Sequence, residues 1–262
     1  KGMFTFMNGA RLHVGVQGLA LAEASYQAAV KFARERLQGR ALSGAKYPDQ
    51  EADPILVHPD VRRMLLTCKA YTEGARAITT WTALLTDREN DHPDPKVRAE
   101  AEALVAFLTP IVKAFITDNA FETTNLALQV FGGHGFIREW GMEQYVRDAR
   151  INMIYEGTNG IQALDLLGRK VLHDDGAKLR QFGKLVGDFV NGQSGHAQMQ
   201  EFTVPLAELA AQVDQLSVEL ALKARANPDE IGAASVPYLR VVGHLVYAWL
   251  WARMARVALD KL

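Results

Sequence analysis

Apolar residues recur every three to four positions along most of the chain, a pattern typical of helices with one buried face. The first stripe includes Leu12, Leu19 and Leu37 and predicts a helix over 10–38. The pattern then breaks in GRALSGAKYPDQEADP, because its glycines and prolines cannot continue a helix. We therefore expect a long helix followed by a loop.

Three more helices are predicted in the first two thirds of the chain. The second begins at Pro59 and stops in DRENDHPDP. The third begins at Asp94 and Pro95, since an aspartate can cap free amides and proline is tolerated in a first turn, and it ends in FGGHGF. The fourth begins near Thr158 and ends around Leu172. Four helices joined by polar loops predict an up-down bundle, and the near absence of strand-like alternation makes the fold class all-α.

The pattern changes at HDDGAKL, after which three further helical stretches follow. They cover approximately 177–191, 203–225 and 235–259, and Ser235 with Pro237 is a plausible cap for the last. We thus predict a helical bundle over 1–173 and a helical C-terminal extension over 174–262.

Composition excludes several classes of protein. The 29 basic and 30 acidic residues give a formal net charge of −1, so no global field attracts nucleic acid. No apolar stretch reaches the roughly 18 residues that cross a bilayer, which argues against membrane insertion. The only cysteine, Cys68, cannot form an intrachain disulfide, and the first residues lack the regions of a signal peptide. These features favour a cytoplasmic location.

The candidate chemistry centres on INMIYEGTNGIQ, where Glu156 precedes a predicted helix. Read alone, Glu156 is a carboxylate attracted by free helix amides, Gly157 is a turn residue, and Thr158 is an N-cap. His134 in GGHG reads as a turn residue, and no second His or Cys lies at metal-ligand spacing, so no metal site is predicted.

The order of three blocks adds a second interpretation. ARERLQGR, ALQVFGGHGF and EQYVRDARINMIYEGTNGIQALDLLGRK follow one another as in the C-terminal half of flavin-dependent acyl-CoA dehydrogenases, which the chain resembles from about Asn8 to Lys170. The tail is similar to the C-terminal extension of the larger bacterial members.

This resemblance implies a reaction and a catalytic residue. Glu156 matches the base that removes the proton alpha to the thioester carbonyl of an acyl-CoA, while FAD accepts the beta hydrogen as hydride and the product is the trans-2-enoyl-CoA. The backbone amide of Glu156 matches a donor to the thioester oxygen, where negative charge develops. Tyr155 and Gly157 match substrate-binding positions: Tyr155 shields the carboxylate, and Gly157 leaves room for the thioester.

The resemblance also implies cofactor contacts and partners. Arg36 matches an arginine that pairs with the flavin pyrophosphate of the adjoining subunit, although an exposed arginine at a helix end would look the same. Gln129 and Gly133 match positions that approach the flavin across a dimer, and Thr158 matches a contact to its diphosphate. These matches imply a homodimer or a dimer of dimers, with an electron-transfer flavoprotein as electron acceptor.

The acyl-CoA dehydrogenases also have an N-terminal helical domain and a middle β domain, which these 262 residues lack. We therefore expect a C-terminal part that is inactive by itself. Three alternatives remain open. They are an acyl-CoA oxidase, a DNA-binding flavoprotein of the alkylation response, which a pI of about 6.7 disfavours, and a noncatalytic helical dimerisation module.

Overall fold

The structure is a computed structural model that describes residues 2–262, with side chains from Met7 onward. Lys1, from which the predicted first domain is counted, lies outside the described residues. Within 2–262 the chain is helical and carries a single isolated bridge, between Leu37 and Pro54, in place of a sheet. The all-α prediction is confirmed. The chain divides into two compact units, each described here by itself.

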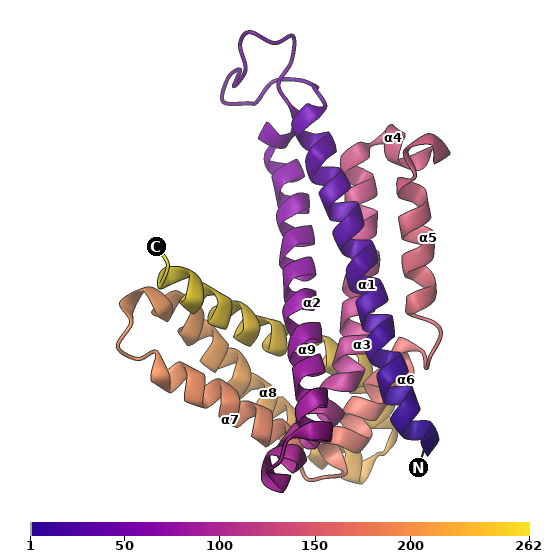
Figure 1. Cartoon of the computed structure of the whole chain (residues 1–262), viewed down its shortest axis with the longest axis vertical. Helices are drawn as coiled ribbons and strands as arrows, with labels where there is room; N and C mark the ends of the chain where they lie inside the picture. The colour runs from indigo at the N-terminus through magenta and orange to yellow at the C-terminus, as the bar shows by residue number, and fades with distance from the viewer. Residues whose placement is uncertain (1) are drawn as a thin grey trace. The chain divides into compact units, whose positions relative to one another are not determined.

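The first unit, called the four-helix unit, comprises His13–Ala75 and Ile116–Glu156. It contains parts of α1 (Gly2–Glu35), α2 (Pro59–Asp91) and α3 (Pro95–Phe131), together with α5 (Met142–Asn152). These segments run side by side in Figure 1. Their common core is formed by Ala29, Ala33, Met64, Leu65, Ala127, Val130, Phe131 and Met142.

This arrangement agrees with the predicted bundle but not with its predicted fourth helix. The sequence pattern predicted no helix over Met142–Asn152, yet α5 contributes Met142 to the core. The stretch predicted as the fourth helix is helical, as α6 (Asn159–Leu164) followed by a π-helix over Asp165–Leu172, but it belongs to the other unit.

Close packing in the four-helix unit encloses the only cysteine. Gly18 of α1 would place a Cβ 3.4 Å from Ala120 of α3, so the two helices approach closely there. Cys68 of α2 is fully buried, and its thiol donates a long hydrogen bond of 3.7 Å to the Thr123 carbonyl of α3. Burial raises the pKa of Cys68 to about 12.

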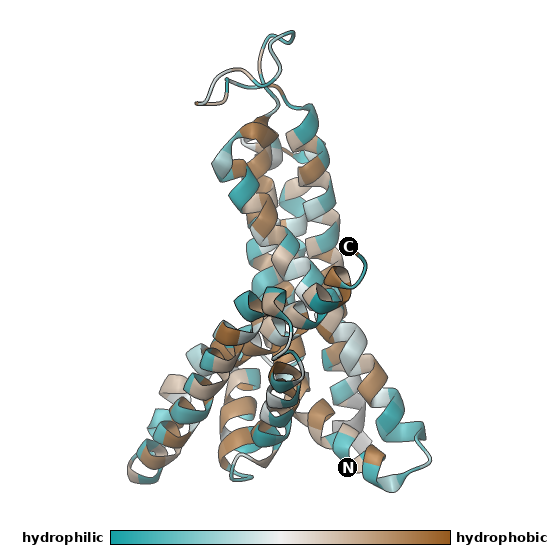
Figure 2. Ribbon diagram, turned by 90° about the vertical axis from the view of Figure 1, so that its left-hand side faces the viewer, coloured by the Kyte–Doolittle hydropathy of each residue, from teal (hydrophilic) through white to brown (hydrophobic). Residues whose placement is uncertain are grey.

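The loop between α1 and α2 is organised around a buried carboxylate. Asp53 is fully buried and accepts hydrogen bonds from the backbone amides of Ala41 at 2.9 Å, Lys46 at 3.0 Å and Tyr47 at 2.8 Å. The Arg40 guanidinium lies 3.4 Å from the same carboxylate. We call residues 39–54 the Asp53 loop; it projects from the ends of α1 and α2 in Figure 1 and carries few apolar residues in Figure 2.

The second unit comprises the described residues up to Leu12, Arg76–Phe115 and Gly157–Leu262. Besides α6 it contains three helices of the C-terminal third: α7 (Ala177–Gly192), α8 (Gln200–Ala226) and α9 (Asp229–Leu259). An aromatic cluster packs α7 and α9 against the parts of α2 and α3 that belong to this unit. In it the ring centroids of Trp81 and Trp249 lie 4.8 Å apart, and those of Phe107 and Phe182 lie 5.7 Å apart.

Helix α9 begins earlier than predicted. Ser235 is not its cap, because it is a buried residue inside the helix whose hydroxyl donates to the Gly232 carbonyl at 3.1 Å. Pro228 is the N-cap residue, and the side-chain oxygen of Asn227 before it accepts from the Asp229 amide at 3.1 Å. The predicted boundary near residue 173 stays a prediction; residues 174–262 lie wholly in the second unit.

None of the helices in the described part of the chain is both long and apolar enough to cross a membrane.

Candidate functional site

The chain takes an unusual backbone conformation at Glu156. Glu156 has a φ of 58° and Gly157 a φ of 83°, so two successive residues are left-handed. Among the described residues only Glu156 and Asp175 combine a side chain with a positive φ. The conformation costs a residue with a Cβ about 1–2 kcal/mol, so the surrounding contacts must hold it in place.

Tyr155 anchors this segment within the four-helix unit. Its hydroxyl donates to the side-chain oxygen of Gln17 on α1, and its ring is half-buried. Glu156 is also half-buried. The Glu156 amide makes no hydrogen bond with any described residue, which leaves a backbone donor beside the carboxylate.

The residues after Glu156 are fixed within the second unit. Thr158 caps α6, because its hydroxyl oxygen accepts from the Ile161 amide at 3.4 Å, as the local sequence predicted. Asn159 accepts a hydrogen bond of 2.8 Å from the buried Lys113 of α3. The fully buried Gln162 donates to the Gly157 carbonyl at 3.4 Å. A Cβ on Gly157 would lie 2.6 Å from that same amide nitrogen, so a larger residue does not fit.

Arg36, Gln129 and Gly133 line one cavity of about 550 Å³ in the four-helix unit. We call it the Arg36 cavity. The exposed Arg36 side chain forms no ion pair with a described residue, and a Cβ on Gly133 would have no atom within 4 Å. A cation beside open glycine backbone is suited to an anionic group such as a phosphate. The residues present therefore fit the pyrophosphate of a dinucleotide.

The Arg36 cavity also has residues that the sequence did not single out. Phe32 stacks on Phe131 with ring centroids 4.1 Å apart, and both line the cavity. His134 lies in the short α4 (Gly133–Phe136), 5.3 Å from the Trp140 ring, and so belongs to this aromatic wall. His58, immediately before α2, lines the cavity as well. The sequence around Phe32 or His58 gives no sign that they line a cavity, because only the path of the Asp53 loop brings the two residues to the same cavity.

The predicted site residues fall into separate groups. Arg36, Gln129 and Gly133 lie together, whereas Glu156 lies beyond the far end of α5, an 11-residue helix about 16 Å long. Thr158 belongs to the second unit.

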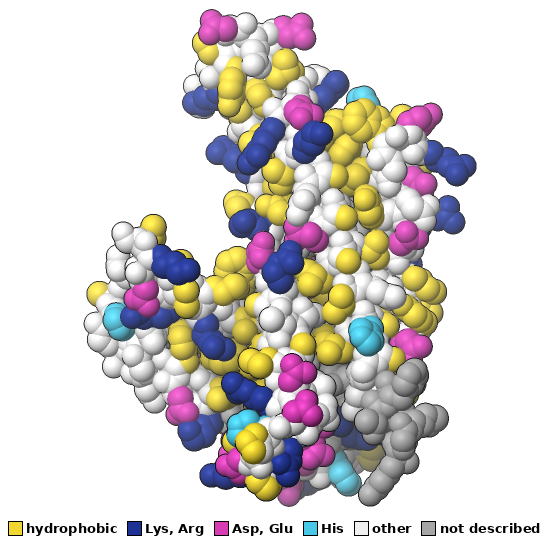
Figure 3. Space-filling view, viewed as in Figure 1, with side chains coloured by type: hydrophobic (Ala, Val, Ile, Leu, Met, Phe, Trp, Pro, Cys, Tyr) yellow, Lys and Arg dark blue, Asp and Glu magenta, His cyan; other side chains and the backbone are white. Residues whose placement is uncertain are grey.

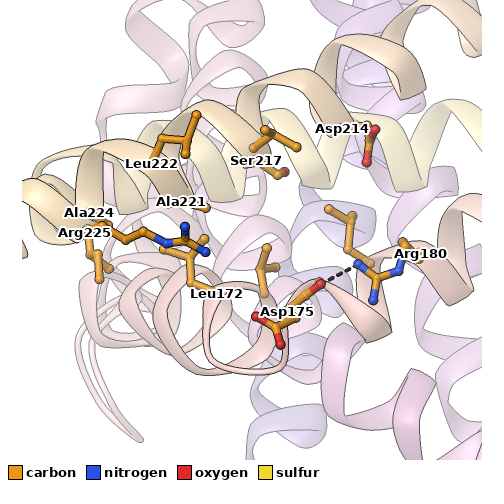
Figure 4. A pocket seen from close by; sticks show the side chains of 14 residues that line it. Leu172, Asp175, Arg180, Asp214, Ser217, Ala221, Leu222, Ala224 and Arg225 are labelled. Atoms are coloured by element: carbon orange, nitrogen blue, oxygen red, sulfur yellow. Dashed lines mark hydrogen bonds between the residues drawn. The ribbon is translucent and has the colours of Figure 1, made fainter.

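A further cavity of about 450 Å³ lies in the second unit and contains none of the predicted residues. Leu172, Leu179, Val218 and Leu222 give it apolar walls, and Arg180, Arg225, Asp175 and Asp214 line it as well (Figure 4). Arg180 donates to the Asp175 carbonyl, the contact that is dashed in Figure 4. No group of three or more His, Cys, Asp or Glu suited to a metal ion occurs among residues 2–262.

Comparison with known families identifies the family of this all-helical chain. The chain belongs to the acyl-CoA dehydrogenases: residues 2–172 match the acyl-CoA dehydrogenase C-terminal domain. Residues 182–262 match a second family, described as acetyl-CoA dehydrogenase C-terminal like.

Two curated relatives illustrate the likeness. The chain is 45% identical over 248 residues to 3-methylmercaptopropionyl-CoA dehydrogenase of Ruegeria pomeroyi, covering 94% of this chain and 42% of that protein. It is 34% identical to the broad-specificity linear acyl-CoA dehydrogenase FadE5 of Mycobacterium tuberculosis, covering 99% of this chain and 44% of that protein. The chain thus spans less than half the length of these relatives. Its two family matches are both to C-terminal regions, one over the bundle and one over the extension.

Solved structures share the fold. Caenorhabditis elegans ACDH-11 in complex with C11-CoA has a TM-score of 0.81 at 18% identity, covering 95% of this chain and 39% of that one. Acyl-CoA oxidase 1 from Yarrowia lipolytica has a TM-score of 0.70 at 18% identity, covering 96% of this chain and 40% of that one. At such identities the likeness concerns the fold alone.

Proposed function

We propose that this chain is the C-terminal part of an FAD-dependent acyl-CoA dehydrogenase that converts an acyl-CoA thioester to the trans-2-enoyl-CoA, with Glu156 as the base. The observation that carries the proposal is the left-handed conformation of Glu156, beside a backbone amide that bonds no described residue, at the position that corresponds to the catalytic base in the sequence resemblance. The names of the curated relatives, both acyl-CoA dehydrogenases, support the reaction class.

The chemistry asks two things of Glu156. Its carboxylate must accept the proton from the carbon alpha to the thioester carbonyl, a very weak acid in water. Its backbone N–H must donate to the thioester oxygen as negative charge develops there, which lowers the barrier to removing the proton. Tyr155 and Gly157 contribute by position: the Tyr155 bond to Gln17 fixes the turn, and Gly157 lets Gln162 pack against the turn while taking the place beside the thioester that the resemblance gives it.

FAD, when bound, accepts the beta hydrogen of the acyl group as hydride. Arg36, Gln129 and Gly133 would hold its pyrophosphate side from the adjoining subunit, and Thr158 would contact the diphosphate in addition to capping α6. This division of contacts makes a homodimer or a dimer of dimers the working assembly. An electron-transfer flavoprotein is the proposed partner that receives the electrons.

The test is Glu156→Gln in the full-length protein. Removing a general base should lower turnover by about 10²- to 10⁴-fold, while the visible spectrum of bound flavin stays unchanged because Gln fits the same turn. Glu143→Gln is the control: Glu143 is another half-buried glutamate of the four-helix unit and lines none of the cavities described above. Near-normal turnover of the Glu156 variant would disprove the assignment.

An acyl-CoA oxidase is the second candidate, because oxidases share the fold. Both enzymes would use Glu156 in the same way and differ in what removes the electrons. Turnover with an artificial acceptor but not with oxygen is expected for the dehydrogenase; equal turnover with oxygen would favour the oxidase. If the full-length protein binds no flavin at all, the noncatalytic dimerisation module replaces both.

A further inference from the structure

A second cavity of the four-helix unit, of about 680 Å³, is lined by three cations and no acid. Arg34 comes from α1, Lys46 and Tyr47 from the Asp53 loop, and Arg62 from α2; Pro54, Leu56 and Val57 form its apolar part. We call it the Lys46 cavity. Figure 3 shows Lys and Arg side chains gathered around the base of the projecting loop.

The three cations are available to a ligand. Neither Arg34 nor Lys46 forms a side-chain ion pair with any described residue. Arg62 donates one N–H to the Val57 carbonyl at 3.2 Å, which fixes its guanidinium at the cavity and leaves its other donors open. Like charges that converge without a counter-charge repel one another, and an anion between them removes that repulsion.

The Asp53 loop holds this arrangement in advance. Asp53 binds the backbone amides of Lys46 and Tyr47, and Arg40 donates to both Asp53 and the Tyr47 carbonyl, the latter at 2.9 Å. The one buried carboxylate of the loop is therefore satisfied internally and does not neutralise the cavity. A loop fixed before binding loses less conformational entropy when a ligand arrives.

The Lys46 cavity is separate from the Arg36 cavity. The segment from Pro54 to Arg62 lies between them and presents different residues to each: Ile55, His58 and Val61 line the Arg36 cavity, whereas Leu56, Val57 and Arg62 line the Lys46 cavity. The two cavities share no lining residue. A ligand in one does not require the other to be filled.

We propose that the Lys46 cavity is a binding site for a nucleoside diphosphate, with its phosphates between Arg34, Lys46 and Arg62 and its base against the Tyr47 ring. Guanidinium and ammonium groups are the usual partners of phosphate, and an aromatic face stacks on any base. Tyr47 is 47% exposed, so its ring is free to stack. The volume lies in the ordinary range of ligand pockets. This site is additional to the proposed catalytic function.

The test is calorimetric titration of the full-length protein with ADP and, separately, with inorganic pyrophosphate. Lys46→Met should weaken both ligands about tenfold, the usual cost of one lost charged hydrogen bond. Lys69→Met is the matched control: Lys69 is an exposed lysine farther along α2 that lines neither cavity, and its loss should change neither affinity. Tyr47→Leu should weaken ADP and leave pyrophosphate unchanged.

Four outcomes would overturn the proposal. The first is that neither ligand binds, and the second is that the Lys46 and Lys69 variants weaken binding equally. The third is that Arg36→Met loses ADP binding while Lys46→Met keeps it. The fourth is that Tyr47→Leu binds ADP as tightly as the unchanged protein. Circular dichroism of each variant checks that the helices are retained. Because binding is measured without turnover, a negative result here leaves the role of Glu156 unaffected.

Discussion

At the scale of single residues, the same backbone device occurs twice with different surroundings. Asp175 and Gly176 have φ values of 52° and 75° and precede α7, just as Glu156 and Gly157 precede α6. At the second turn the Gly176 amide donates to the Val171 carbonyl and Arg180 donates to the Asp175 carbonyl. An acid followed by glycine thus precedes a helix at both places, and the two turns differ in the hydrogen bonds that fix them: at the first, Gln162 donates to the Gly157 carbonyl.

Asp53 yields a prediction for pH. Burial alone would raise its pKa, but the three amide donors and the Arg40 charge outweigh that effect and lower the pKa to about 2. A lowered pKa stabilises the loop above the ordinary carboxyl value of 3.8 and loses that contribution as pH falls toward 2. The amide proton shifts of Ala41 and Tyr47, followed by NMR, should therefore titrate with a midpoint near 2. A midpoint near 3.8 would show that the bonds to Asp53 do not form.

Sequence reasoning at this scale succeeded where the signal is local. Thr158 was predicted as an N-cap, and it caps α6. Asp53 was not singled out, because its partners are backbone amides six to twelve residues away that only the path of the loop brings together. Its place in a loop rich in glycine and proline gives no periodic pattern to read.

At the scale of elements, the long helices were predictable and α5 was not. Helices α2, α3 and α7 begin where turn and cap signals place them. Helix α5 is short and buries only Met142, Ala149 and Asn152, so its apolar face is too sparse to produce a clear helical stripe. The start of α9 was misplaced because Ser235 and Pro237 look like a cap, whereas the helix begins after Pro228, where Asn227 accepts from the Asp229 amide.

The close packing of α9 against α3 at Gly243 leads to a prediction about stability. A Cβ on Gly243 would lie 2.5 Å from the Phe115 ring, so Gly243→Ala should lower the free energy of unfolding by about 1–3 kcal/mol through overpacking. Gly232→Ala is the control on the same helix. No atom lies within 4 Å of its Cβ position, so it should raise that free energy by about 0.5–1 kcal/mol. Urea unfolding of the two variants measures both, and equal effects would show that Phe115 does not seat against Gly243.

At the scale of the whole molecule, fold class and family followed from the sequence, but the cavities did not. Helical periodicity was enough to predict the fold class, and the order of three motif blocks was enough to predict the family. The Arg36 cavity depends on residues from α1, the start of α2 and the end of α3, and the Lys46 cavity depends on how the Asp53 loop returns to α2. Neither arrangement has a signature in local spacing.

The buried cysteine leads to a prediction about opening of the four-helix unit. Because Cys68 is fully buried with a pKa raised to about 12, a thiol reagent can reach its reactive thiolate only after α2 and α3 separate. In the 262-residue chain, labelling with Ellman's reagent should be slower than in the urea-unfolded chain by at least about 10³-fold. Labelling as fast as in urea would contradict this burial.

Because the chain has a single, inaccessible thiol, the labelling rate of that thiol measures how often the four-helix unit opens spontaneously. Any molecule that binds only the closed form should slow labelling by a factor of one plus the ratio of the ligand concentration to Kd, whether it enters the Arg36 cavity or the Lys46 cavity. Each variant can then be compared through its own cysteine, and ligands with no colour and no known turnover can be ranked by how much they slow the labelling of Cys68.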